Sequence, residues 1–327
     1  MEYTTLGRTG LSVSRICLGT MNFGPLTEEA DAHRIMDNAL AEGVNFFDTA
    51  NVYGWGENKG RTEEIVGSWF AQGGGRRERT VLATKLYGDM PLGGQEKWPN
   101  NGRLSALNIR RACDASLKRL RTDYIDLYQF HHVDRATPWE EIWQAMEVLT
   151  AQGKILYAGS SNFAGWHIAL AQAAAAKRDY LGLVAEQSLY NLLARTVELE
   201  VLPSAQHHGL GVIPWSPLQG GLLGGALRRA EAGGRSADRV KQLSETQRAQ
   251  LERWEAFCDK LGQEPGTVAL AWLLHQPAVT APIVGPRTAD QLTSALRAVE
   301  LTLDEAALTE LDDIFPGHKP APEDYAW

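Results

Sequence analysis

The chain has 327 residues, 44% of them hydrophobic, so it can bury a sizeable core in two domains or in one barrel with insertions. Its formal net charge of −8 at pH 7 argues against a nucleic-acid partner, because such binding depends on neutralising phosphates. The start of the chain lacks a basic segment followed by an apolar one, and its longest apolar runs are too short to span a bilayer. We therefore expect a cytoplasmic protein with no membrane partner.

The cysteines Cys17, Cys113 and Cys258 are far apart and odd in number. This predicts buried, reduced side chains, and neither a disulfide framework nor a metal site. The pairs His131-His132 and His207-His208 also lack a ligand spacing with suitable partners, so no metal is expected.

Apolar runs of strand length alternate with helical patterns along the chain. The expected strands are residues 16–21, 46–50, 81–85, 124–131, 155–160, 184–188, 211–216 and 281–285. The expected helices are residues 28–42, 62–72, 104–121, 138–152, 166–177, 196–208, 245–261, 266–275 and 289–299. Repetition of this kind implies parallel strands joined by crossover helices, and eight units fit a (β/α)₈ TIM barrel. We expect residues 1–327 to form this single α/β domain.

Further segments extend the barrel. Residues 3–6 and 13–16 predict a hairpin that closes its bottom, and residues 304–315 predict an extra C-terminal helix. The connections 86–103 and 218–241 follow strand ends and would therefore rim a site at the top. The glycine-rich stretch 220–225 would either flex over a ligand or form a mobile surface loop.

Four polar residues mark the ends of the early strands. Asp48, Lys85 and His131 end or nearly end their strands, and Tyr53 follows Asp48 in the next loop. Because side chains alternate along a strand and parallel strands share one C-terminal edge, these groups are expected to converge there. His132 competes with His131, but alternation with Gln129 favours His131.

These residue types suit proton donation by a phenol. A free tyrosine has a pKa of about 10, and a neighbouring ammonium such as that of Lys85 is expected to lower it. Asp48 would keep Lys85 charged and in place, while His131 would donate a hydrogen bond to a carbonyl oxygen. Each residue alone has an ordinary structural explanation, but four at matching strand ends favour an active site.

The sequence at this point resembles the aldo-keto reductases. The segments that carry the resemblance, in the family's order, are 48–54 (DTANVYG), 83–85 (ATK), 126–131 (DLYQFH), 159–163 (GSSNF), 186–187 (EQ) and 215–218 (WSPL). The resemblance implies a (β/α)₈ barrel and reversible hydride transfer between NADP(H) and an aldehyde or ketone. It also implies Tyr53 as general acid, Lys85 and Asp48 as its tuning pair, and His131 as the residue that orients the carbonyl.

The resemblance further implies a nicotinamide site. Ser161, Asn162 and Gln187 would bind the carboxamide, and Trp215 would stack on the ring. The remaining expected cofactor residues are Gly19, Thr20, Met21, Asp48, Ser216, Pro217, Leu218, Gly220, Leu222, Ile283, Gly285, Arg287 and Gln291.

Cofactor choice depends on the segment 283–288. The chain contains no G-x-G-x-x-G, so a Rossmann site is not expected. The segment instead opens a helix whose N-terminus favours phosphate, and Arg287 offers a planar fork for it. In similar proteins this arginine meets the 2′-phosphate, which implies NADPH over NADH. Many mammalian-type members carry Lys-Ser here, whereas residues 285–288 (GPRT) resemble the branch that includes potassium-channel β subunits and many bacterial reductases.

The substrate is expected to be a small aldehyde, ketone or keto-sugar. Its candidate contacts are Trp55, Tyr87, Trp98, His132 and Trp327. Two other readings stay open. One is a nicotinamide-binding sensor or accessory subunit of the channel-β type, with slow turnover. The other is a barrel hydrolase with paired carboxylates, for which Glu186 is the second acid.

Overall fold

The computed structural model describes residues 1–91, 98–231, 237–319 and 324–326. Within these residues the main sheet has eight parallel strands in the order β10-β3-β4-β5-β6-β7-β8-β9. The strands are β3 (Cys17–Gly19), β4 (Phe46–Asp48), β5 (Val81–Leu86), β6 (Ile125–Phe130), β7 (Ile155–Ser161), β8 (Leu183–Gln187), β9 (Gly211–Val212) and β10 (Ile283–Val284). A bridge between Val212 and Val279, and a 2.8 Å bond from the Ile283 N–H to the Pro214 carbonyl, join the two edges. The predicted (β/α)₈ barrel is confirmed.

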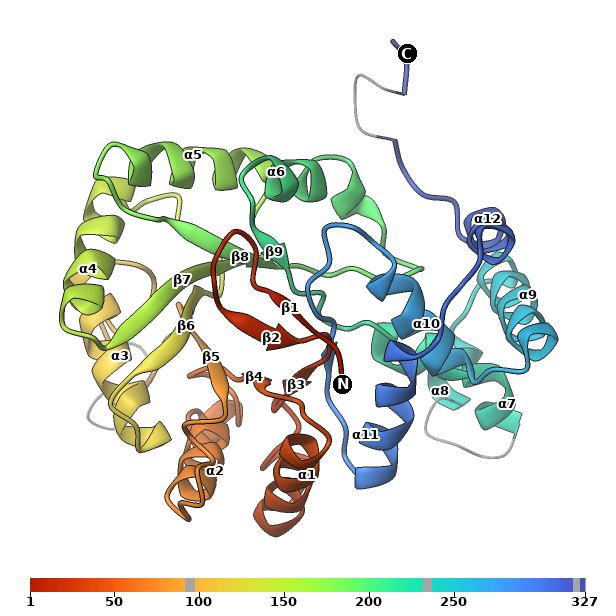
Figure 1. The fold of residues 1–327 in the computed structure, drawn as a ribbon, viewed down its shortest axis with the longest axis horizontal. Coiled ribbons are helices and arrows are strands. Elements are labelled where there is room, and N and C mark those ends of the chain that lie inside the picture. The colour runs from red at the N-terminus through yellow and green to blue at the C-terminus, as the bar shows by residue number, and fades with distance from the viewer. Residues whose placement is uncertain (92–97, 232–236, 320–323, 327) are drawn as a thin grey trace.

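Helices follow the strands and surround the sheet (Figure 1). They are α1 (Glu29–Ala41), α2 (Arg61–Phe70), α3 (Ala106–Leu120), α4 (Trp139–Ala151), α5 (Gly165–Ala176), α6 (Val201–His207), α10 (Pro265–Leu274) and α11 (Ala289–Leu296). Helix α3 shows why such segments are helical. Ser105 caps its first turn by accepting from the Asn108 N–H, and Ile109, Cys113 and Leu120 line one buried face.

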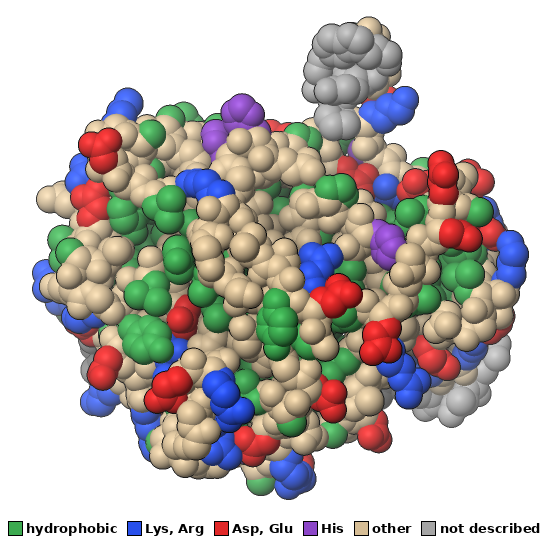
Figure 2. Space-filling view, viewed as in Figure 1, with side chains coloured by type: hydrophobic (Ala, Val, Ile, Leu, Met, Phe, Trp, Pro, Cys, Tyr) green, Lys and Arg blue, Asp and Glu red, His purple; other side chains and the backbone are tan. Residues whose placement is uncertain are grey.

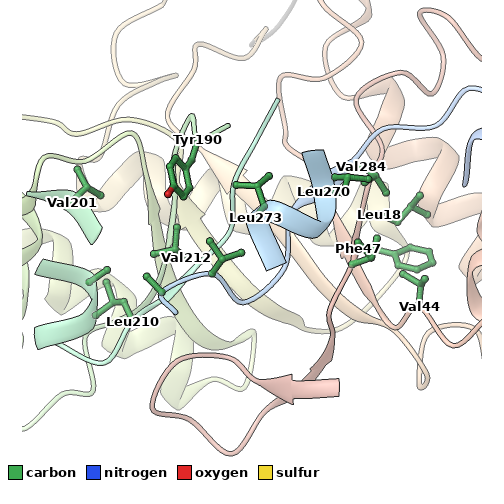
Figure 3. Packing of buried hydrophobic residues seen from close by; sticks show 14 of the residues in the cluster. Leu18, Val44, Phe47, Tyr190, Val201, Leu210, Val212, Leu270, Leu273 and Val284 are labelled. Carbon is green, nitrogen blue, oxygen red and sulfur yellow. The ribbon is translucent and has the colours of Figure 1, made fainter. Parts of the chain in front are cut away.

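The core has an outer and an inner layer because side chains alternate along each strand. Between the sheet and the helices, Phe47 stacks on Trp69 of α2 with ring centroids 5.5 Å apart, and Leu18 and Val44 belong to the same cluster (Figure 3). Inside the barrel, the preceding residue Phe46 packs with the inner strand residues. The residue two positions on, Asp48, therefore shares the inner face with Phe46.

The predicted hairpin and C-terminal helix are confirmed. Strands β1 (Tyr3–Thr5) and β2 (Ser12–Ser14) pair antiparallel and lie across one end of the barrel (Figure 1). Leu6 and Val13 are fully buried in the inner cluster, so the hairpin fills the barrel at that end. Helix α12 (Glu305–Ile314) packs against α9 (Glu245–Leu261) near the C-terminus.

Three expectations are wrong in detail. The single helix at 196–208 is a 3₁₀ turn, η2 (Thr196–Glu198), followed by α6. Strands β9 and β10 are two residues long and not five or six, since Pro214 and Pro282 have no N–H for the ladder. Where a long loop was expected at 218–241, the chain forms η3 (Gln219–Gly224), α7 (Ala226–Glu231) and α8 (Ala237–Lys241).

Acidic and basic side chains are interspersed on the face shown in Figure 2. Across the described ranges, no helix is both long and apolar enough to cross a bilayer. The same residues contain no group of three His, Cys, Asp or Glu side chains that could hold a metal ion.

Candidate active site

Lys85 is the centre of the site. It lies near the end of β5, and its side chain is completely buried. Its ammonium donates to Asp48 Oδ2 at 2.5 Å, to the Thr49 carbonyl at 2.9 Å and to the Tyr53 hydroxyl at 3.1 Å. The structure therefore brings Asp48, Tyr53 and Lys85 together as the sequence predicted.

Burial and neighbouring charges have opposing effects on the pKa values of Lys85 and Tyr53. Burial alone would lower the pKa of Lys85, but the adjacent Asp48 and Tyr53 raise it, and the pKa lies above its ordinary value. Burial raises the pKa of Tyr53, and the positive charge of Lys85 offsets only part of this rise. Lys85 thus lowers the pKa of the phenol as expected, but burial outweighs the ammonium, and the pKa of Tyr53 stays above its ordinary value.

A tight turn at Gly54 determines where the side chain of Tyr53 lies. Gly54 has φ +112°, and a Cβ at this position would lie 1.9 Å from the Asn58 carbonyl oxygen, so glycine is required. The Gly60 N–H donates to the Tyr53 carbonyl at 3.0 Å and closes the turn. The backbone thus folds Tyr53 back over the strand ends.

The second oxygen of Asp48 is held by two amides. Gln187 Nε2 donates to Asp48 Oδ1 at 2.8 Å, and Gln129 Nε2 donates to it at 3.1 Å. Gln187, expected at the nicotinamide carboxamide, is thus also a direct partner of Asp48. Gln129 was not predicted as a site residue, although its alternation with His131 places it on the same inner face. Together the amides and Lys85 fix the carboxylate.

His131 lies beside Tyr53, with ring centroids 6.0 Å apart in an edge-on arrangement. His132 stacks on His131 at 5.0 Å. Burial, the charge of Lys85 and the neighbouring His132 lower the pKa of His131 to about 3. At neutral pH His131 is therefore uncharged and can donate one hydrogen bond from its ring.

Asn162 connects His131 with the predicted nicotinamide residues. Its side chain is exposed, and its Nδ2 donates to the His131 carbonyl at 3.2 Å and to Ser161 Oγ at 3.0 Å. The indole of Trp215 donates to Asn162 Oδ1 at 3.2 Å. Ser161 in turn donates to the carbonyl of Gln187 at 2.8 Å. The structure therefore assembles Ser161, Asn162, Gln187 and Trp215 next to His131.

The segment 216–224 follows Trp215 and contains the next group of predicted cofactor residues. These are Ser216, Pro217, Leu218, Gly220 and Leu222. Asn191 Nδ2 donates to the Ser216 carbonyl at 2.9 Å, and Arg239 Nη1 donates to the Gly220 carbonyl at 2.8 Å. Asn191 and Arg239 were not singled out from the sequence, because their partners are distant in the chain.

The N-terminus of α11 carries the predicted phosphate residues after Ile283 of β10. Gln291 Oε1 accepts from the Arg287 N–H at 2.8 Å, and Thr288 caps the helix. The Arg287 guanidinium has no hydrogen-bond or ion-pair partner in the part of the chain that the structure describes. A nearby contact is the 2.8 Å bond from Asn22 to the carbonyl of the exposed Gly285.

Strand β3 contributes Gly19 at its end, followed by Thr20 and Met21. Thr20 is buried, and its hydroxyl donates to the Asp48 backbone carbonyl at 2.9 Å. Met21 is exposed. Thr20 therefore supports the strand end that carries Asp48.

The candidate substrate residues divide into two groups. Trp55 packs 5.6 Å from Tyr53, and Tyr87 packs edge-on at 5.3 Å against His132, so one ring lies beside the phenol and the other beside the neighbour of His131. Trp98 is exposed with no such ring contact in the described segments. Trp327 lies outside the described residues.

The residues present fit a nicotinamide nucleotide. Asn162 offers an exposed amide beside the half-buried indole of Trp215, which suits a carboxamide and a flat ring. The unpartnered guanidinium of Arg287 stands at a helix N-terminus, which suits a phosphate. The paired carboxylates of a hydrolase are not formed. Glu186 is bound instead by Ser160 and Ser188, on the opposite strand face from Gln187.

Comparison with known proteins agrees with this geometry. The sequence profile described as the aldo/keto reductase family matches residues 15–315. The chain belongs to the aldo/keto reductase family. As a member it is an oxidoreductase that acts on small carbonyl compounds, and the family generally uses NAD(P)H.

Relatives of this aldo/keto reductase span its whole length. It is 58% identical over 100% of both chains to the uncharacterized oxidoreductase YrpG of Bacillus subtilis (strain 168). It is 33% identical to the versiconal hemiacetal acetate reductase of Aspergillus parasiticus, over 98% of this chain and 100% of that one. It is 32% identical to a probable voltage-gated potassium channel subunit beta of Arabidopsis thaliana, over 99% and 100%. The predicted branch is confirmed.

Proposed function

We propose that this aldo/keto reductase is a single-domain enzyme that reduces aldehydes or ketones to alcohols with NADPH. The observation that carries the proposal is the buried ammonium of Lys85, which touches both Asp48 and the Tyr53 hydroxyl. Such an arrangement supplies a proton from a phenol and stabilises the phenolate that remains.

In the proposed reaction, NADPH held by the residues named below would supply a hydride for the carbonyl carbon. The raised pKa of Tyr53 keeps its hydroxyl protonated at neutral pH, so that it can donate a proton to the carbonyl oxygen. Neutral His131 donates a hydrogen bond to the same oxygen and orients it. Lys85 then stabilises the phenolate at a hydrogen-bond distance of 3.1 Å, and Asp48 keeps Lys85 charged.

The proposed cofactor contacts are made by the residues that lie next to His131 and at the N-terminus of α11. Asn162 and Ser161 would bind the carboxamide, Trp215 would stack on the ring, and Arg287 would bind the 2′-phosphate. Gln187 is already engaged by Asp48, so it would connect the carboxamide site with the catalytic carboxylate.

The test is NADPH oxidation, with NADH in parallel, against aromatic aldehydes, aliphatic aldehydes, ketones, hemiacetals and keto-sugars. The panel includes several aromatic carbonyls because the ring of Trp55 lies beside Tyr53 and that of Tyr87 lies beside His132. Turnover with a clear preference for NADPH is the expected result. Tight NADPH binding with negligible turnover across the panel would instead favour a sensor or accessory subunit, as the name of the Arabidopsis relative suggests.

A further inference from the structure

Glu186 is a buried acid that the proposed reaction does not use. It is completely buried on β8, between Ala185 and Gln187. Its Oε2 accepts from Ser160 Oγ at 2.5 Å, and its Oε1 accepts from Ser188 Oγ at 2.7 Å and from the Phe163 N–H at 3.1 Å. One carboxylate thus joins β7, the turn after β7 and the residue that follows β8.

The turn that Glu186 holds contains a backbone conformation that needs support. Asn162 has φ +61°, in the left-handed region that asparagine adopts more readily than other non-glycine residues but that still costs conformational energy. Its own N–H donates to the Gln187 carbonyl at 3.0 Å, and the next N–H, that of Phe163, donates to Glu186. Adjacent residues of β8 therefore secure both peptide groups that flank Asn162.

The conformation of Asn162 decides where its amide lies. In this conformation the amide donates to the His131 carbonyl and accepts from the Trp215 indole. Relaxing the turn would move the amide relative to both residues, because a peptide rotation at Asn162 swings its side chain. Glu186 itself makes none of these contacts, so it acts only through the turn.

We propose that Glu186 is a positioning residue that presents Asn162 to the nicotinamide end of the nucleotide. The proposal rests on the proposed function, which places a nicotinamide nucleotide at Asn162. Burial raises the pKa of Glu186 to about 7, so the carboxylate form that accepts all three donors predominates at pH 8.

The experiment compares two ligands by isothermal titration calorimetry at pH 8. NADPH carries the nicotinamide, whereas 2′-phospho-ADP-ribose lacks it. Glu186→Ala and Glu186→Asp are expected to weaken NADPH about tenfold and 2′-phospho-ADP-ribose less than about twofold, because a backbone donor beside Asn162 loses its acceptor. Glu186→Gln keeps an acceptor oxygen for the Phe163 N–H and is expected to bind NADPH within about threefold of the wild type.

Glu63 supplies a matched control. Its carboxylate is also completely buried, and it accepts from Thr84 Oγ1 at 2.6 Å and from Arg119 Nε at 2.7 Å on the outer side of the sheet. Glu63→Ala is expected to lower the melting temperature without changing the ratio of the two dissociation constants. This separates general destabilisation from an effect on the nicotinamide end.

Each outcome decides the proposal. Equal weakening of both ligands by Glu186→Ala, or no weakening of either, overturns it. If Glu186→Ala does not fold, Glu186→Asp and Glu186→Gln decide, and equal NADPH affinities in these two also overturn it. If the wild type binds neither NADPH nor NADH, the proposed function itself fails. A wild type that binds and turns over, with no selective loss in the variants, refutes only the role of Glu186.

Discussion

At the residue scale, the site depends on a conflict between burial and charge at Tyr53. Burial favours the neutral phenol, and Lys85 favours the phenolate. A proton donor for carbonyl reduction needs both effects, because it must stay protonated until the reaction and must then be stabilised as an anion. In the proposed reaction Lys85 would serve this purpose, because its charge is shielded from solvent and held by Asp48.

Replacing the phenol tests this argument. Tyr53→Phe removes the proton donor and is expected to lower kcat for carbonyl reduction by about 10²–10⁴-fold, while NADPH affinity stays within about twofold. Steady-state kinetics and calorimetry check this. Tyr128→Phe is the matched control, because the buried Tyr128 hydroxyl has no partner among the described residues and its loss should leave kcat unchanged. Full activity in Tyr53→Phe would refute the acid assignment.

The pKa of His131 predicts a dependence of stability on pH. Its folded value of about 3 lies below the ordinary 6.5, so between these values the unfolded state binds the extra proton and stability falls as pH falls. His131→Gln removes this loss and should reduce the drop in unfolding free energy between pH 7 and 5 by about 1–2 kcal/mol, measured by urea titration.

Glu186 provides a control of opposite sign. Its folded pKa of about 7 lies above the ordinary 4.5, so its contribution to stability grows as pH falls through this range. Glu186→Gln should therefore make the unfolding free energy fall more steeply as the pH is lowered from 7 to 5. Identical pH slopes in both variants and the wild type would contradict the shifted pKa values.

At the element scale, the sequence predicted those features of the site that follow from the alternation of side chains along a strand and from where each strand ends. Asp48, Lys85 and His131 were assigned correctly to one edge because each follows an apolar run and parallel strands end together. Gln129 was missed as a partner of Asp48, since an amide inside a barrel is identified only by what it contacts.

The same limit explains the errors after β9. Helix α7 is short and begins where the Leu227 N–H donates to Glu255 of α9 at 2.8 Å, a partner far along the chain. Gly220 and Gly221 have positive φ within η3 and break any helical repeat in the sequence. Local patterns therefore predicted a loop where long-range contacts form helices.

The N-terminus of α11 gives a prediction at this scale. Arg287→Ala removes the unpartnered guanidinium and is expected to weaken NADPH by about 10–100-fold, because a charge-assisted bond to phosphate is lost, and NADH by less than about twofold. Arg297→Ala, at an exposed arginine just after the same helix, is the control and should change neither affinity. Equal weakening of NADPH and NADH by Arg287→Ala would place this side chain away from the 2′-phosphate.

At the scale of the whole molecule, the candidate active site and the closing hairpin lie at opposite ends of the barrel. The site lies at the C-terminal ends of the strands, and the β1–β2 hairpin fills the other end with Leu6 and Val13. Arg15 follows the hairpin and donates to the carbonyls of Val279 and Thr280, beside the junction of β9 and β10. The hairpin therefore stabilises the barrel without contributing to the site.

This separation predicts that stability can be lost without loss of chemistry. Leu6→Ala leaves a cavity in the inner cluster and is expected to lower the unfolding free energy by about 2–5 kcal/mol, measured by urea titration, with kcat unchanged at a temperature where the variant is folded. Leu156→Ala, at an exposed position of β7, should change the unfolding free energy by less than about 0.5 kcal/mol and leave kcat unchanged. A fall in kcat for Leu6→Ala with no loss of stability would contradict this separation. It would mean that the hairpin affects the position of Asp48 and Lys85 at the other end of the barrel.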